Sequence, residues 1–133
     1  MRMQLKNSIY KIIGKEDEGD VFNYTIQLIP SCFIYQAHFP GEPITPGVCI
    51  VQIGKELIEE LLAEQTSKPQ TLEIIKVKNV KFLSIISPNE AKQLVCQIKK
   101  MELSEDKTKI EAQVVVLSEH KAMAKISLVM QCV

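Results

Sequence analysis

The chain has 133 residues, a mass of 15.0 kDa and 46% hydrophobic residues, which fits a single domain over residues 1–133 with its own core. Its 16 Lys and Arg residues balance its 16 Asp and Glu residues, so the excess positive charge of nucleic-acid-binding domains is absent. No apolar run approaches the roughly 20 residues that cross a bilayer and no signal peptide is evident, so we expect a cytoplasmic protein without membrane span or nucleic acid partner.

Two strands are predicted near the N-terminus. Residues 9–13 and 21–29 are rich in β-branched and aromatic side chains. The stretch between them is charged and contains glycine, which is typical of a turn. The next segment, residues 31–47, holds three of the six prolines and two of the five glycines between Pro40 and Gly47. That density excludes regular structure and predicts a stiff, shaped loop.

A long helix is predicted directly after this loop. In residues 48–65, apolar side chains recur at helical spacing, as at Ile50, Ile53 and Leu57. Thr45 is the expected N-cap and Pro46 the expected first helical residue, while Ser67 and Pro69 mark the exit. We expect the first half to be buried on all sides, with Gly54 permitting close approach of a neighbour. The second half is expected to expose a polar stripe, namely Lys55, Glu56, Glu59, Glu60 and Glu64.

Alternating patterns then predict four further strands, over residues 72–83, 94–103, 109–117 and 122–133. A six-stranded sheet with one long helix must pack that helix across one of its faces, because no other element can bury the apolar stripe. The sequence therefore predicts an α+β layer fold. The other sheet face or its edge must be solvated or covered by a second copy, so a homodimer is a reasonable expectation.

Four cysteines are widely spaced, with no CxxC pair and no Cys/His cluster at zinc-ligand spacing. We expect reduced thiols that act as small hydrophobes, and neither a metal nor a redox pair. Cys49 falls on the first turn of the predicted helix. The helix dipole there favours a lowered thiol pKa, whereas burial favours an inert side chain, and burial is the preferred interpretation.

His38 is the candidate catalytic residue that the chemistry of the loop suggests. It lies at the start of the rigid loop that leads into a helix N-terminus, where backbone N–H groups lack acceptors. A neutral imidazole suits a general base near pH 7, and the free N–H groups suit a developing oxyanion. The competing interpretation is a hydrogen-bonded structural histidine.

The string HFPGEPITPGV at residues 38–48 resembles the HFPGxPxxPGV signature of bacterial 3-hydroxyacyl-acyl-carrier-protein dehydratases. Residues 77–90 are similar to a family segment in which a Lys-Phe pair precedes a proline-containing turn. The resemblance covers most of the chain. It implies the hot-dog fold, in which a curved antiparallel sheet wraps around one long central helix. It also implies a dimer with active sites at the interface, and an acyl thioester substrate on the phosphopantetheine of acyl carrier protein or coenzyme A. No further cofactor is implied.

By this resemblance, His38 removes the proton α to the thioester carbonyl. The amides near Gly47 and Val48 bind the thioester oxygen, and the rest of the motif lines the substrate site through Phe39, Pro40, Gly41 and Pro46. The family's acidic residue lies fourteen positions after the histidine, on the helix of the other subunit. In this chain that position is Gln52, whose amide has no titratable proton to give at neutral pH.

Three explanations of Gln52 remain open. The chain dehydrates a less demanding substrate with Gln52 placing the hydroxyl, or with Glu42 or Glu56 recruited as the acid. Alternatively, it is a weak or silent subunit that pairs with an active hot-dog chain. A thioesterase is the third option. Gln52 could also simply begin the polar stripe of the helix.

A basic cluster is the candidate surface for an acidic carrier protein. It comprises Lys76, Lys78, Lys81, Lys99 and Lys100. Solvated strand faces are the plainer interpretation of each single lysine. Among the remaining candidates, Phe33, Tyr35 and Phe39 are expected to form the wall between loop and helix, and His120, in a predicted hairpin turn, receives no role.

Overall fold

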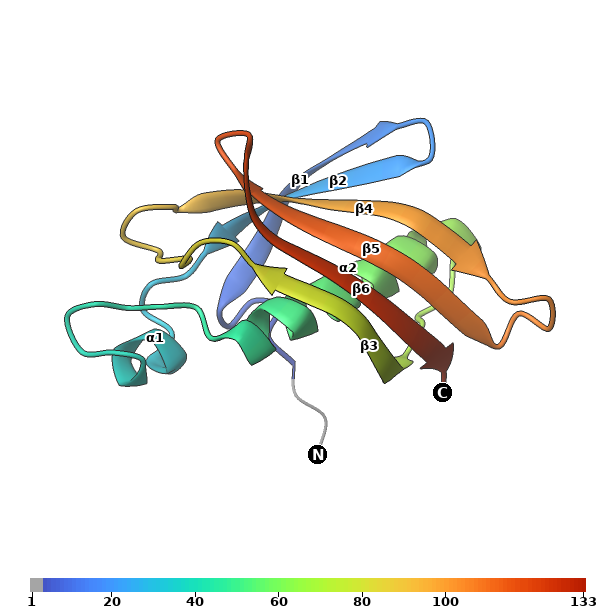
Figure 1. Ribbon diagram of the computed structural model, residues 1–133, viewed down its shortest axis with the longest axis horizontal. Coiled ribbons are helices and arrows are strands. Elements are labelled where there is room, and N and C mark those ends of the chain that lie inside the picture. Colours follow the sequence, from blue (N-terminus) through green and yellow to red (C-terminus); the bar gives the residue numbers. More distant parts are fainter. Residues whose placement is uncertain (1–3) are drawn as a thin grey trace.

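The computed structural model describes residues 4–133, and within them the chain forms six strands and two helices (Figure 1). In chain order they are β1 (Tyr10–Glu18), β2 (Val21–Leu28), α1 (Phe33–Ala37), α2 (Gly47–Thr66), β3 (Leu72–Phe82), β4 (Gln93–Leu103), β5 (Lys109–Ser118) and β6 (Lys121–Cys132).

The six strands form one sheet in the order β1-β2-β4-β5-β6-β3, and every neighbouring pair is antiparallel. The sheet curves around α2, which connects β2 to β3 at the opposite edge (Figure 1). This is the hot-dog arrangement, so the expected α+β fold with one long central helix is confirmed. Among residues 4–133, no helix is long and apolar enough to cross a membrane.

The core lies between α2 and the concave face of the sheet. Leu57, Ile58 and Leu61 of α2 are completely buried, and Val114 and Ile126 of the central strands are equally inaccessible. Gly54 lies directly over β5, where an added Cβ would be 3.5 Å from a methyl group of Val114. The expected close approach at Gly54 is therefore real, although the space is that of an ordinary van der Waals contact.

Two boundaries differ from the prediction. β1 continues through the charged segment expected to be a turn, and the chain reverses only at Gly19, which has φ +64°. Charged side chains are tolerated there because β1 is an edge strand. The predicted loop contains a short helix, α1, which precedes the first proline of the cluster and buries Tyr35.

The ends of α2 are close to the prediction, but the cap is different. Pro46 is the N-cap rather than the first helical residue, and no side chain within residues 4–133 forms a capping hydrogen bond there. Thr45 is not the cap because its buried hydroxyl forms a 2.8 Å hydrogen bond with the Tyr35 hydroxyl. At the other end, Ser67 closes the helix in the left-handed conformation, as its position indicated.

The polar stripe predicted for the second half of α2 is wrong for three of its five members. Lys55, Glu56 and Glu59 are buried, whereas Val48 at the start of the helix is 68% exposed. The backbone on either side of the helix covers these charges. Glu59 accepts a 2.7 Å bond from the backbone N–H of Leu72, and the Lys55 ammonium donates to the Leu72 carbonyl over 3.1 Å.

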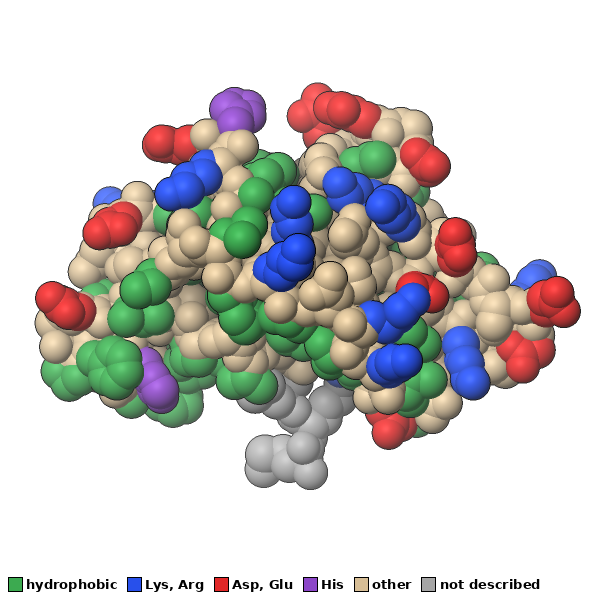
Figure 2. All heavy atoms as spheres, in the orientation of Figure 1, with side chains coloured by type: hydrophobic (Ala, Val, Ile, Leu, Met, Phe, Trp, Pro, Cys, Tyr) green, Lys and Arg blue, Asp and Glu red, His purple; other side chains and the backbone are tan. Residues whose placement is uncertain are grey.

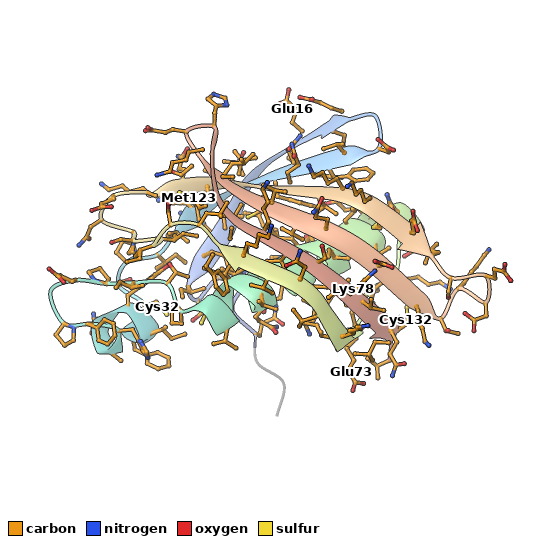
Figure 3. The ribbon with its side chains drawn as sticks, in the orientation of Figure 1. Glu16, Cys32, Glu73, Lys78, Met123 and Cys132 are labelled. Carbon is orange, nitrogen blue, oxygen red and sulfur yellow. The ribbon has the colours of Figure 1, made fainter. Side chains whose placement is uncertain are left out.

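All four cysteines are free thiols, and three are buried. Burial raises the pKa of the Cys49 thiol and raises that of Cys96 to about 12, which agrees with inert side chains rather than an activated thiol. Cys132 differs from the expectation because it is exposed at the end of β6, far along the sheet from Cys32 beside α1 (Figure 3).

Candidate active site

Backbone hydrogen bonds fix the loop that carries His38. The backbone N–H of His38 donates to the Ile34 carbonyl over 2.9 Å, and this bond ends α1. The His38 carbonyl accepts a 2.6 Å bond from the Ile44 N–H. Within this span, Phe39 and Glu42 exchange backbone bonds of 3.0 and 2.9 Å, and Gly41 has φ +82°. The turn needs glycine at position 41, because other residues rarely adopt that conformation. The loop is therefore shaped, as its proline and glycine content predicted.

The His38 imidazole is exposed, and it forms no side-chain hydrogen bond with any residue in the described part of the chain. Its ring lies 5.1 Å from that of Phe39, centroid to centroid, at 48°. The peptide bond between these two residues is cis. The interpretation of His38 as a hydrogen-bonded structural residue is therefore not supported, and its ring nitrogens face no competing partner.

The two segments that carry the family resemblance meet at the start of α2. The backbone N–H of Thr45 donates to the Ile86 carbonyl over 2.8 Å. The Phe82 ring lies so close to Gly47 that a Cβ there would be 2.9 Å from two ring atoms. A side chain at position 47 would therefore displace the Phe82 ring, and this contact connects the loop to the end of β3.

The start of α2 offers backbone donors next to this loop. The first bonds within the helix run from the N–H groups of Cys49 and Ile50 to the Pro46 carbonyl, over 3.0 and 3.1 Å. The amides of Gly47 and Val48 precede these donors and lie at the positive end of the helix dipole. The geometry suits an oxygen that gains negative charge.

Gln52 lies one turn further along α2 and is half-buried. Its side-chain N–H donates to a carboxylate oxygen of Glu56 over 2.9 Å. Glu56 in turn is only 4% exposed. Of the two acids considered as substitutes, Glu56 is therefore enclosed by protein, while Glu42 is exposed at the tip of the turn.

An apolar rim of exposed side chains lies on α1, the His38 loop, the start of α2, the end of β3 and the segment after it. It contains Phe33, Phe39, Val48, Phe82, Leu83 and Ile85, each more than half exposed. Figure 2 shows hydrophobic side chains gathered over α1 and the loop that follows it. Tyr35 is not part of this rim, because it is buried against Thr45 and burial raises its pKa to about 12. An apolar rim of this kind is typical of a surface that contacts another molecule.

Inside the protein, a narrow apolar cavity lies beneath the start of α2. Its volume is about 10 Å³, close to the least that holds one water molecule. The residues that line it are Ile26, Leu28, Thr45, Ile50, Ile53, Ile86, Leu94, Cys96 and Val116. Residues 4–133 contain no group of three or more His, Cys, Asp or Glu side chains that could hold a metal ion.

The fold and the histidine loop define the chain as a hot-dog protein. Solved structures with this fold include the dehydratase heterocomplex ApeI:P from Xenorhabdus doucetiae, with a TM-score of 0.60, 16% identity and coverage of 90% of this chain and 96% of that one. A thioesterase from Haemophilus influenzae has a TM-score of 0.63 at 12% identity, and the matched region covers 96% of this chain and 80% of the thioesterase chain. At these identities the similarity shows the fold alone.

The sequence defines the family more narrowly. The model of the ApeI-like dehydratases matches residues 14–124, and the chain belongs to this family. A 3-hydroxyacyl-[acyl-carrier-protein] dehydratase FabZ from Wolbachia pipientis is 32% identical over 96 residues, which are 71% of this chain and 65% of that protein. FabZ from Clostridium acetobutylicum is 35% identical over 72 residues, 51% of this chain and 49% of that protein. The chain thus spans about half to two thirds of the length of these relatives.

Proposed function

We propose that this chain is a hydro-lyase that acts on 3-hydroxyacyl thioesters and converts them into trans-2-enoyl thioesters. The observation that carries the proposal is the exposed His38 ring, which forms no side-chain hydrogen bond within residues 4–133 and lies on a loop fixed to the N-terminus of α2. Membership of a dehydratase family supports the same reaction.

In the proposed mechanism, an imidazole nitrogen of His38 takes the proton from the carbon α to the thioester carbonyl. The electron pair moves toward the thioester oxygen, which accepts hydrogen bonds from the amides of Gly47 and Val48. The pair then forms the C2–C3 double bond as the bond from C3 to the hydroxyl breaks. Because Gln52 has no acidic proton, the proton held by His38 goes to the departing hydroxyl, which leaves as water.

The substrate is proposed to reach the site as a thioester on the phosphopantetheine arm of acyl carrier protein or coenzyme A. The chain needs no further cofactor for this reaction. The remaining motif residues, Phe39, Pro40, Gly41 and Pro46, shape the entrance for that arm. The cavity beneath α2 is too small for an acyl chain, so the room for it is proposed to come from the apolar rim and a second hot-dog chain.

The second candidate function is a partner subunit that binds substrate weakly and completes the site of an active hot-dog chain. Two observations favour it. Gln52 replaces the acid that the resemblance implies, and the apolar rim is exposed on the single chain. The solved ApeI:P relative is itself described as a dehydratase heterocomplex.

Turnover of a short 3-hydroxyacyl thioester and of its enoyl counterpart tests these proposals. We expect His38→Ala to lower the rate by about 10²- to 10⁴-fold, the usual contribution of a positioned acid or base. His120→Ala is the matched control, since His120 lies in the β5–β6 turn and is expected to leave the rate unchanged. Equal loss in both variants would contradict the role of His38.

Three further results distinguish the alternatives. Inactive parent protein with a Gln52→Glu variant that turns over substrate indicates a site that lacks only its acid. Inactivity of both, together with tight association with a second hot-dog chain that becomes more active, indicates the partner subunit. Release of free acid from a simple acyl thioester indicates a thioesterase instead.

A further inference from the structure

Glu56 is a buried carboxyl group with an unusually complete set of donors. One oxygen accepts bonds from the backbone N–H of Lys6 over 2.8 Å and from the Tyr10 hydroxyl over 3.0 Å. The other accepts from the backbone N–H of Leu5 over 2.8 Å and from the Gln52 amide over 2.9 Å. Four donors converge on two oxygens, the arrangement in which an ionised carboxylate is stabilised without a cation.

This arrangement determines which end of the Gln52 amide faces Glu56. A carboxylate accepts hydrogen bonds and donates none, so the NH₂ group rather than the carbonyl oxygen of Gln52 must face Glu56. Three of the four donors come from the N-terminal segment and β1, so the carboxylate is fixed by elements outside α2. The Gln52 amide is therefore tied to a rigid acceptor one helical turn away.

We propose that Glu56 is a positioning residue that holds the side chain at position 52, and that it turns any carboxyl group placed there into one half of a proton-sharing pair. This proposal rests on the proposed function only in that position 52 is part of the proposed active site. Two carboxyl oxygens at the 2.9 Å separation of the present bond cannot both be ionised. A glutamic acid at position 52 would therefore retain its proton and donate a hydrogen bond to Glu56.

The Glu56 carboxylate has a consequence for catalysis by the Gln52→Glu variant. A carboxyl group that stays protonated at neutral pH is the form that a general acid requires. Glu56 is not available to the substrate itself, since each of its oxygens already accepts two hydrogen bonds from the protein. Glu56 is thus the second carboxylate that would keep an acid at position 52 protonated, although the chain itself carries Gln52.

Other titratable and charged groups lie near residues 52 and 56, and their contribution to the pH dependence of stability must be separated from that of the pair. Lys6 pairs with Glu60 over 2.9 Å, and Lys55 lies 3.8 Å from Glu59. Burial and the neighbouring Glu56 raise the pKa of Tyr10, and burial raises that of Cys49, so neither thiol nor phenol titrates in the neutral range. The parent protein contains all of these groups and is the reference at each pH.

The test is urea unfolding of parent and Gln52→Glu proteins between about pH 5 and pH 8, a measurement that does not depend on catalytic activity. In the folded variant, the pKa of the carboxyl group at position 52 is raised above its unfolded value of about 4.3. The stabilisation is therefore complete below about pH 4.3 and is lost as the pH rises toward the folded-state pKa. We expect its folding equilibrium constant, relative to the parent, to fall by up to tenfold for each pH unit. Gln65→Glu, the same change at an exposed position of α2, is expected to follow the parent.

A Gln52→Met variant, which removes the bond to Glu56 without adding a carboxyl group, supplies the second arm. Its stability is expected to show no such loss between pH 5 and pH 8. A Gln52→Glu variant with the pH dependence of the parent overturns the proposal. So does one that fails to fold at pH 5, where a protonated side chain would keep the bond to Glu56. Inactivity of every variant would contradict the proposed function without affecting this result.

Discussion

At the scale of single residues, His38 and Gly47 illustrate different limits of prediction. The motif identified His38 as a candidate base, but only the structure shows that its ring is exposed and has no hydrogen-bonded partner among the described residues. Gly47 was expected only to provide a backbone amide. Its contact with Phe82 joins positions 35 residues apart, and no local pattern predicts such a pair.

The first prediction concerns this contact. In Gly47→Ala, the new methyl group would lie 2.9 Å from the Phe82 ring, so the half-exposed ring must move. We expect a loss of roughly 1 kcal/mol in the free energy of unfolding, at the low end of overpacking costs because the ring can swing outward. Urea unfolding measures this loss. With Phe82→Ala already present, the same substitution is expected to cost much less, and an equal cost in both backgrounds would contradict the contact.

At the scale of elements, the apolar periodicity predicted α2 almost to its ends, but not which of its polar residues are buried. Lys55, Glu56 and Glu59 follow the spacing of a solvated stripe. They are buried because the N-terminal segment and the start of β3 place backbone groups over them. Those contacts lie 13 to 51 residues away in sequence, so helical periodicity carries no information about them. The expected long strands were found for the same reason that α2 was: alternation is a local property.

Gly54 gives a second prediction, opposite in sign to the first. An alanine methyl at this position would make ordinary contacts of 3.5 to 3.8 Å with Val114. Alanine favours a helix interior by about 0.8–1.0 kcal/mol over glycine. We therefore expect Gly54→Ala to stabilise the protein by roughly 0.5–1 kcal/mol in urea unfolding. A loss of stability would show that α2 packs more tightly against β5 than this geometry allows.

At the scale of the whole molecule, element order and fold class followed from the sequence, whereas strand order did not. The family resemblance implied the hot-dog fold, yet the pairing of β3 with β6 across the helix depends on contacts between distant segments. This pairing leaves β1 and β3 as the two edges of the sheet. It also turns Lys76 and Lys81 toward the outer face, since their partners Val129 and Lys125 alternate along β6 with the buried Leu128 and Ile126.

This outer face is the proposed contact for an acidic carrier protein. Figure 2 shows basic side chains spread across the sheet, and Figure 3 places Lys78 on β3. We expect Glu substitutions at Lys76, Lys78 and Lys81 together to weaken carrier-protein binding most at low salt, where charges are least screened. Titration calorimetry at two salt concentrations measures this. Lys78 also pairs with Glu111 over 2.5 Å, so the folded state must be checked. Unchanged affinity at low salt would refute the docking surface.

The role of His38 as the base that removes the α-proton is tested most directly by deuterium exchange. A 3-hydroxyacyl thioester is incubated with the protein in D₂O, and mass spectrometry measures deuterium at C2 of the recovered substrate. We expect the parent protein to incorporate deuterium even if Gln52 makes loss of water slow, because an exposed imidazolium exchanges its proton with solvent. His38→Ala is expected to abolish incorporation and His120→Ala to leave it unchanged. Incorporation that persists in His38→Ala at the parent rate would contradict the proposed mechanism.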